Sequence, residues 1–231
     1  MALVASAVTA LLSLVLAWRL GKRYGQRRSL HSLFYALGLA FAAVAAGADF
    51  VARAMGQWHP LAFRLYWFSA AGLVGLLGMG SAALLGRPAA EGRGGAAVRW
   101  IANAALAILA VLVLWLAGAA ATFPVDPAVL GQVGEIATRA PEGVKAPFVL
   151  TSSVGATVIF LGALWSWWLT RRHPVLLIAL GTVFFSAGGL AGRFGGVAAF
   201  YAAQALGSIL LYLGVEGSFS RPAGRGPGVG G

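Results

Sequence analysis

The stretch of sequence that decides the fold runs from residue 45 to residue 80 and reads AAGADFVARAMGQWHPLAFRLYWFSAAGLVGLLGMG. It holds the end of one apolar segment, a short polar turn (GQWHP) and the beginning of a second apolar segment. Two apolar segments of this kind, joined by so short a turn, predict a pair of antiparallel helices in a lipid bilayer. Asp49, Arg53 and Arg64 flank the turn, so charge is concentrated where the two helices meet.

The composition of the whole chain agrees with a membrane environment. Hydrophobic residues make up 60% of the 231 residues and charged residues only 10%. The 17 basic residues outnumber the six acidic ones, but they cluster in short loops between apolar runs. We therefore interpret them as a signal of membrane topology, with lipids and no nucleic acid as partners.

Seven apolar runs are long enough to cross about 30 Å of hydrocarbon at 1.5 Å per residue. Basic residues follow the first run and none precedes it, which favours a retained helix over a cleaved signal peptide. The sequence predicts an all-α fold, a bundle of seven transmembrane helices with residues 1–217 as its membrane domain. The predicted spans are residues 2–20, 32–53, 62–85, 99–121, 148–170, 174–192 and 197–215.

The distribution of lysine and arginine predicts the orientation of the bundle. Placing the first connection in the cytoplasm puts most of these residues on that side, as the positive-inside rule requires. The N-terminus is then outside and the C-terminus inside. A composition rich in alanine, glycine and arginine favours a bacterium with a GC-rich genome, and hence the bacterial inner membrane.

Two segments outside the spans carry their own signals. In the outer loop 122–147, Asp126 can cap a short amphipathic helix that begins at Pro127. Its apolar face would hold Val129, Leu130, Val133 and Ile136. This helix is expected to lie on the outer surface, either as a passive connector or as a lid. The tail 218–231 is rich in glycine and proline and is predicted to be disordered.

An internal repeat is one interpretation of a short similarity between two segments. HSLFYALGLAF at 31–41 is similar to HPVLLIALGTVFF at 173–185. Helices one to three would then match helices five to seven, with the fourth as a linker, in the 3+1+3 plan of parallel repeats. The alternative is that two apolar sequences agree by chance.

Counting residues along the helices places four charges near the outer boundary. Asp49 lies about 27 Å above His31, Arg53 is one turn farther along, and Arg64 and Arg193 reach the same level from their own helices. Three arginines beside one aspartate leave an excess of positive charge for a small anionic solute or a lipid head group. The predicted ligand-binding residues are Asp49, Arg53, Arg64, Tyr66, Trp67, Arg193, Tyr201 and Gln204.

Two other interpretations of the same charges are open. A salt-bridged rim would pin helices two, three and six together while long arginines reach the lipid phosphates. Alternatively, Asp49 would carry protons. At the other end of the seventh helix, Glu216 is expected to pair with Arg19, Arg171 or Arg172.

Residues that are absent disfavour an enzyme. The chain has no cysteine, and His31, His59 and His173 lie far apart at predicted membrane boundaries, so we expect neither a metal site nor a cofactor. No span contains a lysine for a Schiff base. We expect a non-enzymatic binding protein, transporter-like or receptor-like. The alternatives are a structural subunit or scaffold, as a homo-oligomer or in a larger membrane complex with glycine-rich helix three or six as its docking face, and a metal-independent lipid-modifying enzyme.

Three segments carry a resemblance to known proteins: FRLYWFSAAGLVGLLGMGSAALL at 63–85, GALWSWWLTRRH at 162–173 and LLIALGTVFFSAGG at 176–189. In these segments the chain resembles small seven-span proteins of high-GC bacteria for which no activity is known. The resemblance implies an inner-membrane fold. It carries over no site residue.

Overall fold

The computed structural model describes residues 2–86, 95–133, 140–171, 173–193 and 197–219, and these residues form eight helices and no strand. The fold is therefore all-α. Seven helices are long, and each contains one of the predicted apolar runs. The helices are α1 (Ala2–Arg27), α2 (Leu30–Met55), α3 (Pro60–Leu85), α4 (Gly95–Thr122), α5 (Pro127–Leu130), α6 (Glu142–Thr170), α7 (His173–Arg193) and α8 (Val197–Phe219).

Five helices, α1 to α4 and α6, are long and apolar enough to cross a membrane. In α7 and α8 the described apolar stretches, Leu176–Phe185 and Ala199–Gly214, are shorter than such a span. Many large apolar side chains of the long helices are exposed on the outside of the molecule, as expected where lipid is the solvent. The chain is a multi-pass membrane protein.

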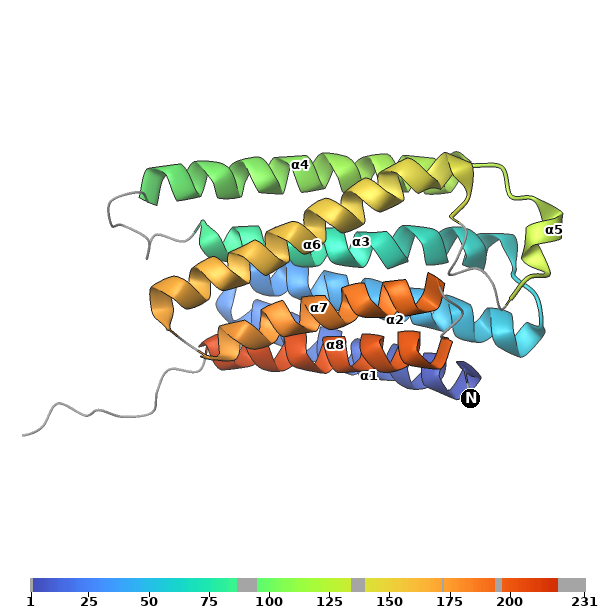
Figure 1. The fold of residues 1–231 in the computed structure, drawn as a ribbon, viewed down its shortest axis with the longest axis horizontal. Helices are drawn as coiled ribbons and strands as arrows, with labels where there is room; N and C mark the ends of the chain where they lie inside the picture. Colours follow the sequence, from blue (N-terminus) through green and yellow to red (C-terminus); the bar gives the residue numbers. More distant parts are fainter. Residues whose placement is uncertain (1, 87–94, 134–139, 172, 194–196, 220–231) are drawn as a thin grey trace, which may run out of the picture.

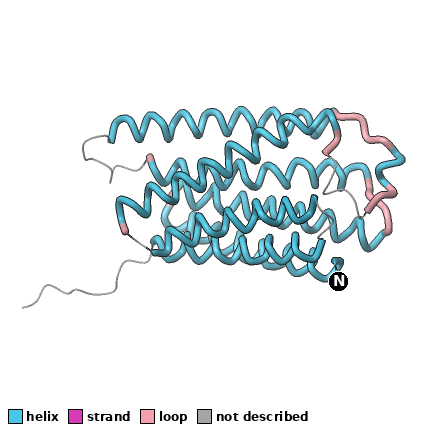
Figure 2. Tube along the Cα trace, in the orientation of Figure 1, coloured by secondary structure: helices cyan, strands magenta, loops and turns pink. Residues whose placement is uncertain are grey.

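The long helices lie side by side along the long axis of the molecule (Figure 1). Six of them form a closed ring, because α1 packs on α2, α2 on α3, α3 on α6, α6 on α7, α7 on α8, and α8 on α1. Helix α4 lies outside this ring and packs on α3 and α6. The N-terminus and α5 lie at one end of the bundle, here called the α5 end, together with most of the described loop residues (Figure 2).

Glycines let α3 approach its neighbours closely. A Cβ atom on Gly155 of α6 would lie 2.6 Å from the carbonyl oxygen of Val74 on α3, and one on Gly78 would lie 3.0 Å from the Cα of Gly155. Contact this close between helix backbones needs small residues on both sides. The glycines of α3 thus pack inside the chain's own bundle. The surroundings of Gly188 and Gly192 in α7 lie outside the described part of the chain.

The turn between α2 and α3 is defined by local chemistry. Helix α2 ends at Met55 and is capped by Gly56, whose φ of 69° is in the left-handed region that favours glycine. Helix α3 begins at Pro60, and the preceding His59 accepts a hydrogen bond at its ring Nδ1 from the backbone N–H of Leu61 at 3.3 Å. The two apolar segments of the 45–80 stretch therefore fold as an antiparallel pair.

In the described part of the outer loop, one short helix forms, α5. The Asp126 carboxylate accepts a hydrogen bond from the backbone N–H of Ala128 at 2.9 Å, and Pro127 occupies the first turn. The backbone N–H of Trp58 donates to the carbonyl oxygen of Leu130 at 2.8 Å. Val129, Leu130 and Val133 pack on the aromatic core at the α5 end. Ile136 and residues 220–231 of the predicted disordered tail lie outside the described residues.

Candidate binding site

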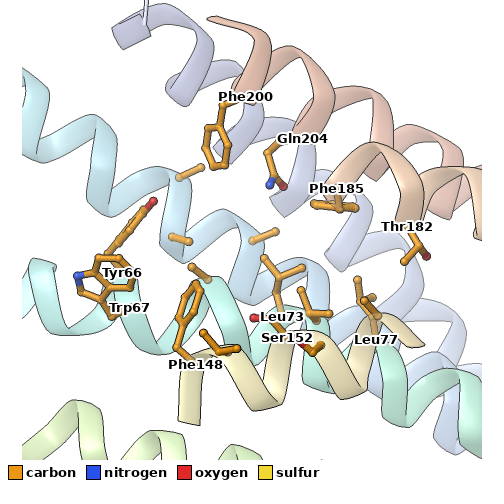
Figure 3. Close-up of a pocket in the computed structure, with 18 of the residues that line it drawn as sticks. Tyr66, Trp67, Leu73, Leu77, Phe148, Ser152, Thr182, Phe185, Phe200 and Gln204 are labelled. Carbon is orange, nitrogen blue, oxygen red and sulfur yellow. The ribbon is translucent and has the colours of Figure 1, made fainter. Parts of the chain in front are cut away.

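A cavity of about 670 Å³ lies inside the ring of six helices. Every helix of the ring contributes at least one side chain to its wall, whereas α4 contributes none. The wall is mostly alanine, leucine, valine, isoleucine and aromatic side chains, several of which are shown in Figure 3. A space of this size and character is typical of sites for small apolar ligands.

Polar groups occupy a few defined places on this wall. Gln204 of α8 and Ser152 and Ser153 of α6 line the cavity. The Gln204 side chain extends from α8 toward the cavity (Figure 3), and it makes no hydrogen bond to another described residue. A primary amide offers two donors and an acceptor, so a ligand in the cavity can bond to it.

A single cation, Lys145, lines the cavity among the described residues. It lies in the first turns of α6, and its side chain is 58% exposed, so the cavity reaches the surface of the molecule at this point. The ammonium group pairs with Glu142 at 3.2 Å, and the Glu142 side chain is 89% exposed. Exposed pairs of this kind contribute only about 0–1 kcal/mol to stability.

Asp49 forms a buried cluster that joins α2 to α8. Its Oδ2 atom accepts a hydrogen bond from Arg53 Nε at 2.7 Å and another from the Tyr201 hydroxyl. The Arg53 guanidinium also lies over the Tyr201 ring, 5.8 Å from its centroid. Asp49 is only 4% exposed, so the arginine offsets a charge that would be costly without a partner.

Arg64 is directed away from this cluster. Its Nη1 atom donates to the carbonyl oxygen of Ala120 at 3.0 Å and to that of Ala121, and its guanidinium lies 4.9 Å from the centroid of the Phe123 ring. These carbonyl groups are in the last turn of α4, where a helix has no internal donors for them and where a positive charge is favourable. Arg64 therefore joins α3 to α4.

The eight predicted site residues thus fall into separate groups. Tyr66, Trp67, Tyr201 and Gln204 line the cavity, and Tyr201 also contacts the Asp49–Arg53 pair beside it. Arg64 belongs to neither group. Arg193 ends α7, and its side chain lies outside the described part of the structure.

Several cavity residues could not be recognised from the sequence. Lys145 was expected in the outer loop, and Ser152 and Ser153 were expected to bond between helices. Their neighbour Thr151 does so, because its hydroxyl donates to the Leu112 carbonyl of α4 at 3.3 Å. Phe148, Phe185 and Phe200 complete the wall as ordinary apolar residues of their helices.

A second polar group lies at the end opposite to α5. Arg19 Nη1 donates to the Tyr212 hydroxyl at 3.3 Å, which joins α1 to α8. Glu216 interacts with both residues, so its partnership with Arg19 agrees with the expected boundary pair. Arg172 is outside the described residues.

Comparison of the chain with models of protein families, with curated proteins and with solved structures finds no match. Among the described residues, no group of three or more histidine, aspartate or glutamate side chains is placed to hold a metal ion.

Proposed function

We propose that the protein is a bacterial inner-membrane protein with seven spans, its N-terminus outside, that binds a lipid-like amphiphile with an anionic head group. The observation that carries this proposal is the apolar cavity that reaches the surface at Lys145. The apolar chain of the ligand occupies the cavity, and its head group binds at Lys145. The role is transporter-like or receptor-like.

The lengths of α7 and α8 support seven spans. Helix α7 has 21 residues and α8 has 23, so they measure about 31 and 34 Å at 1.5 Å per residue. Both lengths match a hydrocarbon core of about 30 Å. The α5 end carries few basic residues, and this distribution supports an outward position for α5 and Lys145.

The charges near the α5 end support Lys145 as the head-group residue. Asp49 neutralises Arg53, and Arg64 is bound to backbone carbonyl groups of α4. Lys145 has only an exposed glutamate as its described partner, and an incoming phosphate or carboxylate can replace that partner at little cost. We therefore propose Lys145, at the rim, for the anion-binding role that was expected of Arg53 and Arg64.

Equivalent packing in two helix pairs supports the 3+1+3 repeat. In the α2–α3 pair, Gly38 packs against Leu77, and Tyr35 packs against Gly80. The α7–α8 pair has matching contacts between Gly181 and Leu211 and between Ile178 and Gly214. The two α2 residues are separated from their counterparts in α7 by the same number of residues. The two α3 residues are likewise separated from their counterparts in α8 by one common number. A cavity between two such halves is the arrangement that transporters with internal repeats use.

Ligand-dependent stabilisation tests the proposal. The protein is reconstituted in nanodiscs of zwitterionic lipid, and its thermal unfolding midpoint is measured with dodecyl phosphate and with dodecyl trimethylammonium. We expect dodecyl phosphate alone to raise the midpoint, because only an anion pairs with Lys145.

Two lysine variants provide the matched comparison. Lys145→Ala should weaken the stabilisation by dodecyl phosphate, whereas Lys22→Ala should leave it unchanged. Lys22 is the chain's other lysine, and it lies near the far end of α1, where its ammonium group is 5.8 Å from the centroid of the Trp18 ring. Equal effects of the two amphiphiles, or of the two variants, would contradict the proposal.

A further inference from the structure

The cavity is lined by equivalent positions of the two proposed halves. Leu77 of α3 and Leu211 of α8 are equivalent positions, and the same difference in residue number relates three further cavity-lining residues of α3 to cavity-lining residues of α8. The difference that relates α2 to α7 gives one more such pair. These pairs are Tyr66 and Phe200, Trp67 and Tyr201, Ala70 and Gln204, and Ala42 and Phe185, and all eight residues line the cavity.

A ligand in this cavity therefore meets two walls of similar shape, one from each half. Similar walls cannot by themselves decide which way a ligand turns its polar groups. The orientation is decided where the paired residues differ in hydrogen-bonding capacity. Tyr201 differs from Trp67, but its hydroxyl already donates to Asp49. Tyr66 carries a hydroxyl where its counterpart Phe200 has none, and Trp67 Nε1 is buried without a hydrogen-bond partner among the described residues.

A further difference is the pair formed by Ala70 and Gln204. On the α3 wall of the cavity, Ala70 presents a methyl group. At the equivalent position on the α8 wall, Gln204 presents a primary amide. The amide has no hydrogen-bond partner among the described residues and extends toward the cavity (Figure 3). Leaving such a group without a partner in an apolar site is costly, so a bound ligand that supplies one gains affinity.

We infer that Gln204 is a specificity-determining residue of the cavity, and that its amide N–H groups donate to the ester or amide carbonyl of an acyl chain. The ligand class is then a monoacyl lipid with an anionic head group. This inference rests on the proposed function. It adds that the carbonyl group, and not only the head group and the chain, is recognised.

Two lipids that differ only in this carbonyl group provide the test. Lysophosphatidic acid with an ester-linked chain carries the carbonyl, and its ether-linked analogue has the same head group and chain without it. Binding of each to the protein in nanodiscs is measured by native mass spectrometry. The wild-type protein should bind the ester about three- to tenfold more tightly, the range expected for one neutral hydrogen bond.

Variants at the paired positions complete the experiment. Gln204→Leu keeps the size of the side chain and removes its donors, so it should abolish the preference by weakening binding of the ester alone. The double variant Ala70→Gln with Gln204→Ala moves the amide to the equivalent position on α3 and should restore the preference.

Three results would overturn the inference. Equal affinities of the wild-type protein for the two lipids would refute it while leaving the proposed function intact. A preference that survives Gln204→Leu would assign the carbonyl contact to another residue. Binding of neither lipid would refute both the inference and the proposed function. If Gln204→Leu does not fold, the wild-type comparison and the double variant still test the inference, because equal affinities for the two lipids in either protein would refute it.

Discussion

Replacement of Arg64 by alanine should destabilise the fold and leave ligand binding intact. Arg64 makes charge-assisted hydrogen bonds to the carbonyl groups of Ala120 and Ala121 and lies over the Phe123 ring. A hydrogen bond from a charged donor contributes about 1.5–3 kcal/mol, and a cation at a helix C-terminus about 0.3–1 kcal/mol. Because the site is partly exposed, we expect Arg64→Ala to lower the free energy of unfolding by about 2–3 kcal/mol in total.

The assay is unfolding by sodium dodecyl sulfate in mixed micelles, followed by circular dichroism. Arg64→Lys keeps the charge but loses the planar guanidinium group, so it should lower the unfolding free energy by less than Arg64→Ala does. Arg99→Ala removes an exposed arginine at the other end of α4 and should change the unfolding free energy by less than about 0.5 kcal/mol. A similarly small effect of Arg64→Ala would refute the anchoring role. Loss of dodecyl phosphate binding in a folded Arg64→Ala protein would show that Arg64 belongs to the ligand-binding site.

Two further predictions concern the buried cluster and the close helix contact. Asp49→Asn should lower the unfolding free energy by about 3 kcal/mol, because it removes the opposite charge from Arg53, whose side chain is only 17% exposed. Combining it with Tyr201→Phe should cost less than the sum of the single changes. A double-mutant cycle by the same unfolding assay measures this coupling, and strict additivity would contradict it. Gly155→Ala should cost about 1–3 kcal/mol, because its methyl group would meet a backbone carbonyl of α3 at 2.6 Å. The methyl group of Gly118→Ala would meet open space, so this change should raise the unfolding free energy by about 0.5–1 kcal/mol. Equal effects at the two glycines would show that α3 and α6 are not in close contact.

The helices were predictable because hydropathy along the chain reports directly on the solvent around each segment. Each predicted run lies inside a helix, but most of the helices extend beyond the runs. Helix α6 begins at Glu142, whereas the outer loop was expected to continue to Pro147. A proline near the start of a helix removes only one internal hydrogen bond, so the helix tolerates it. That extension places Lys145, which was expected in the outer loop, on a helix beside the cavity.

The candidate site was only partly predictable because counting residues gives the depth of a side chain but not its direction. Asp49, Arg53 and Arg64 do lie at the same end of the bundle. Helix α2 turns the first two toward Tyr201 of α8, while α3 turns Arg64 toward the last carbonyl groups of α4. Which face of a helix meets which neighbour depends on packing in three dimensions. Tyr201 does lie beside Asp49, although the hydrogen bond between them could not be derived from spacing.

The most direct test of the central claim is X-ray diffraction from crystals grown with an alkyl phosphate that carries bromine on its last carbon. The account predicts an anomalous bromine peak inside the ring, near Leu77 and Leu211 at the apolar depth of the cavity, with the phosphate beside Lys145. Bromine found only against the lipid-facing surface, for example along the exposed face of α4, would contradict it.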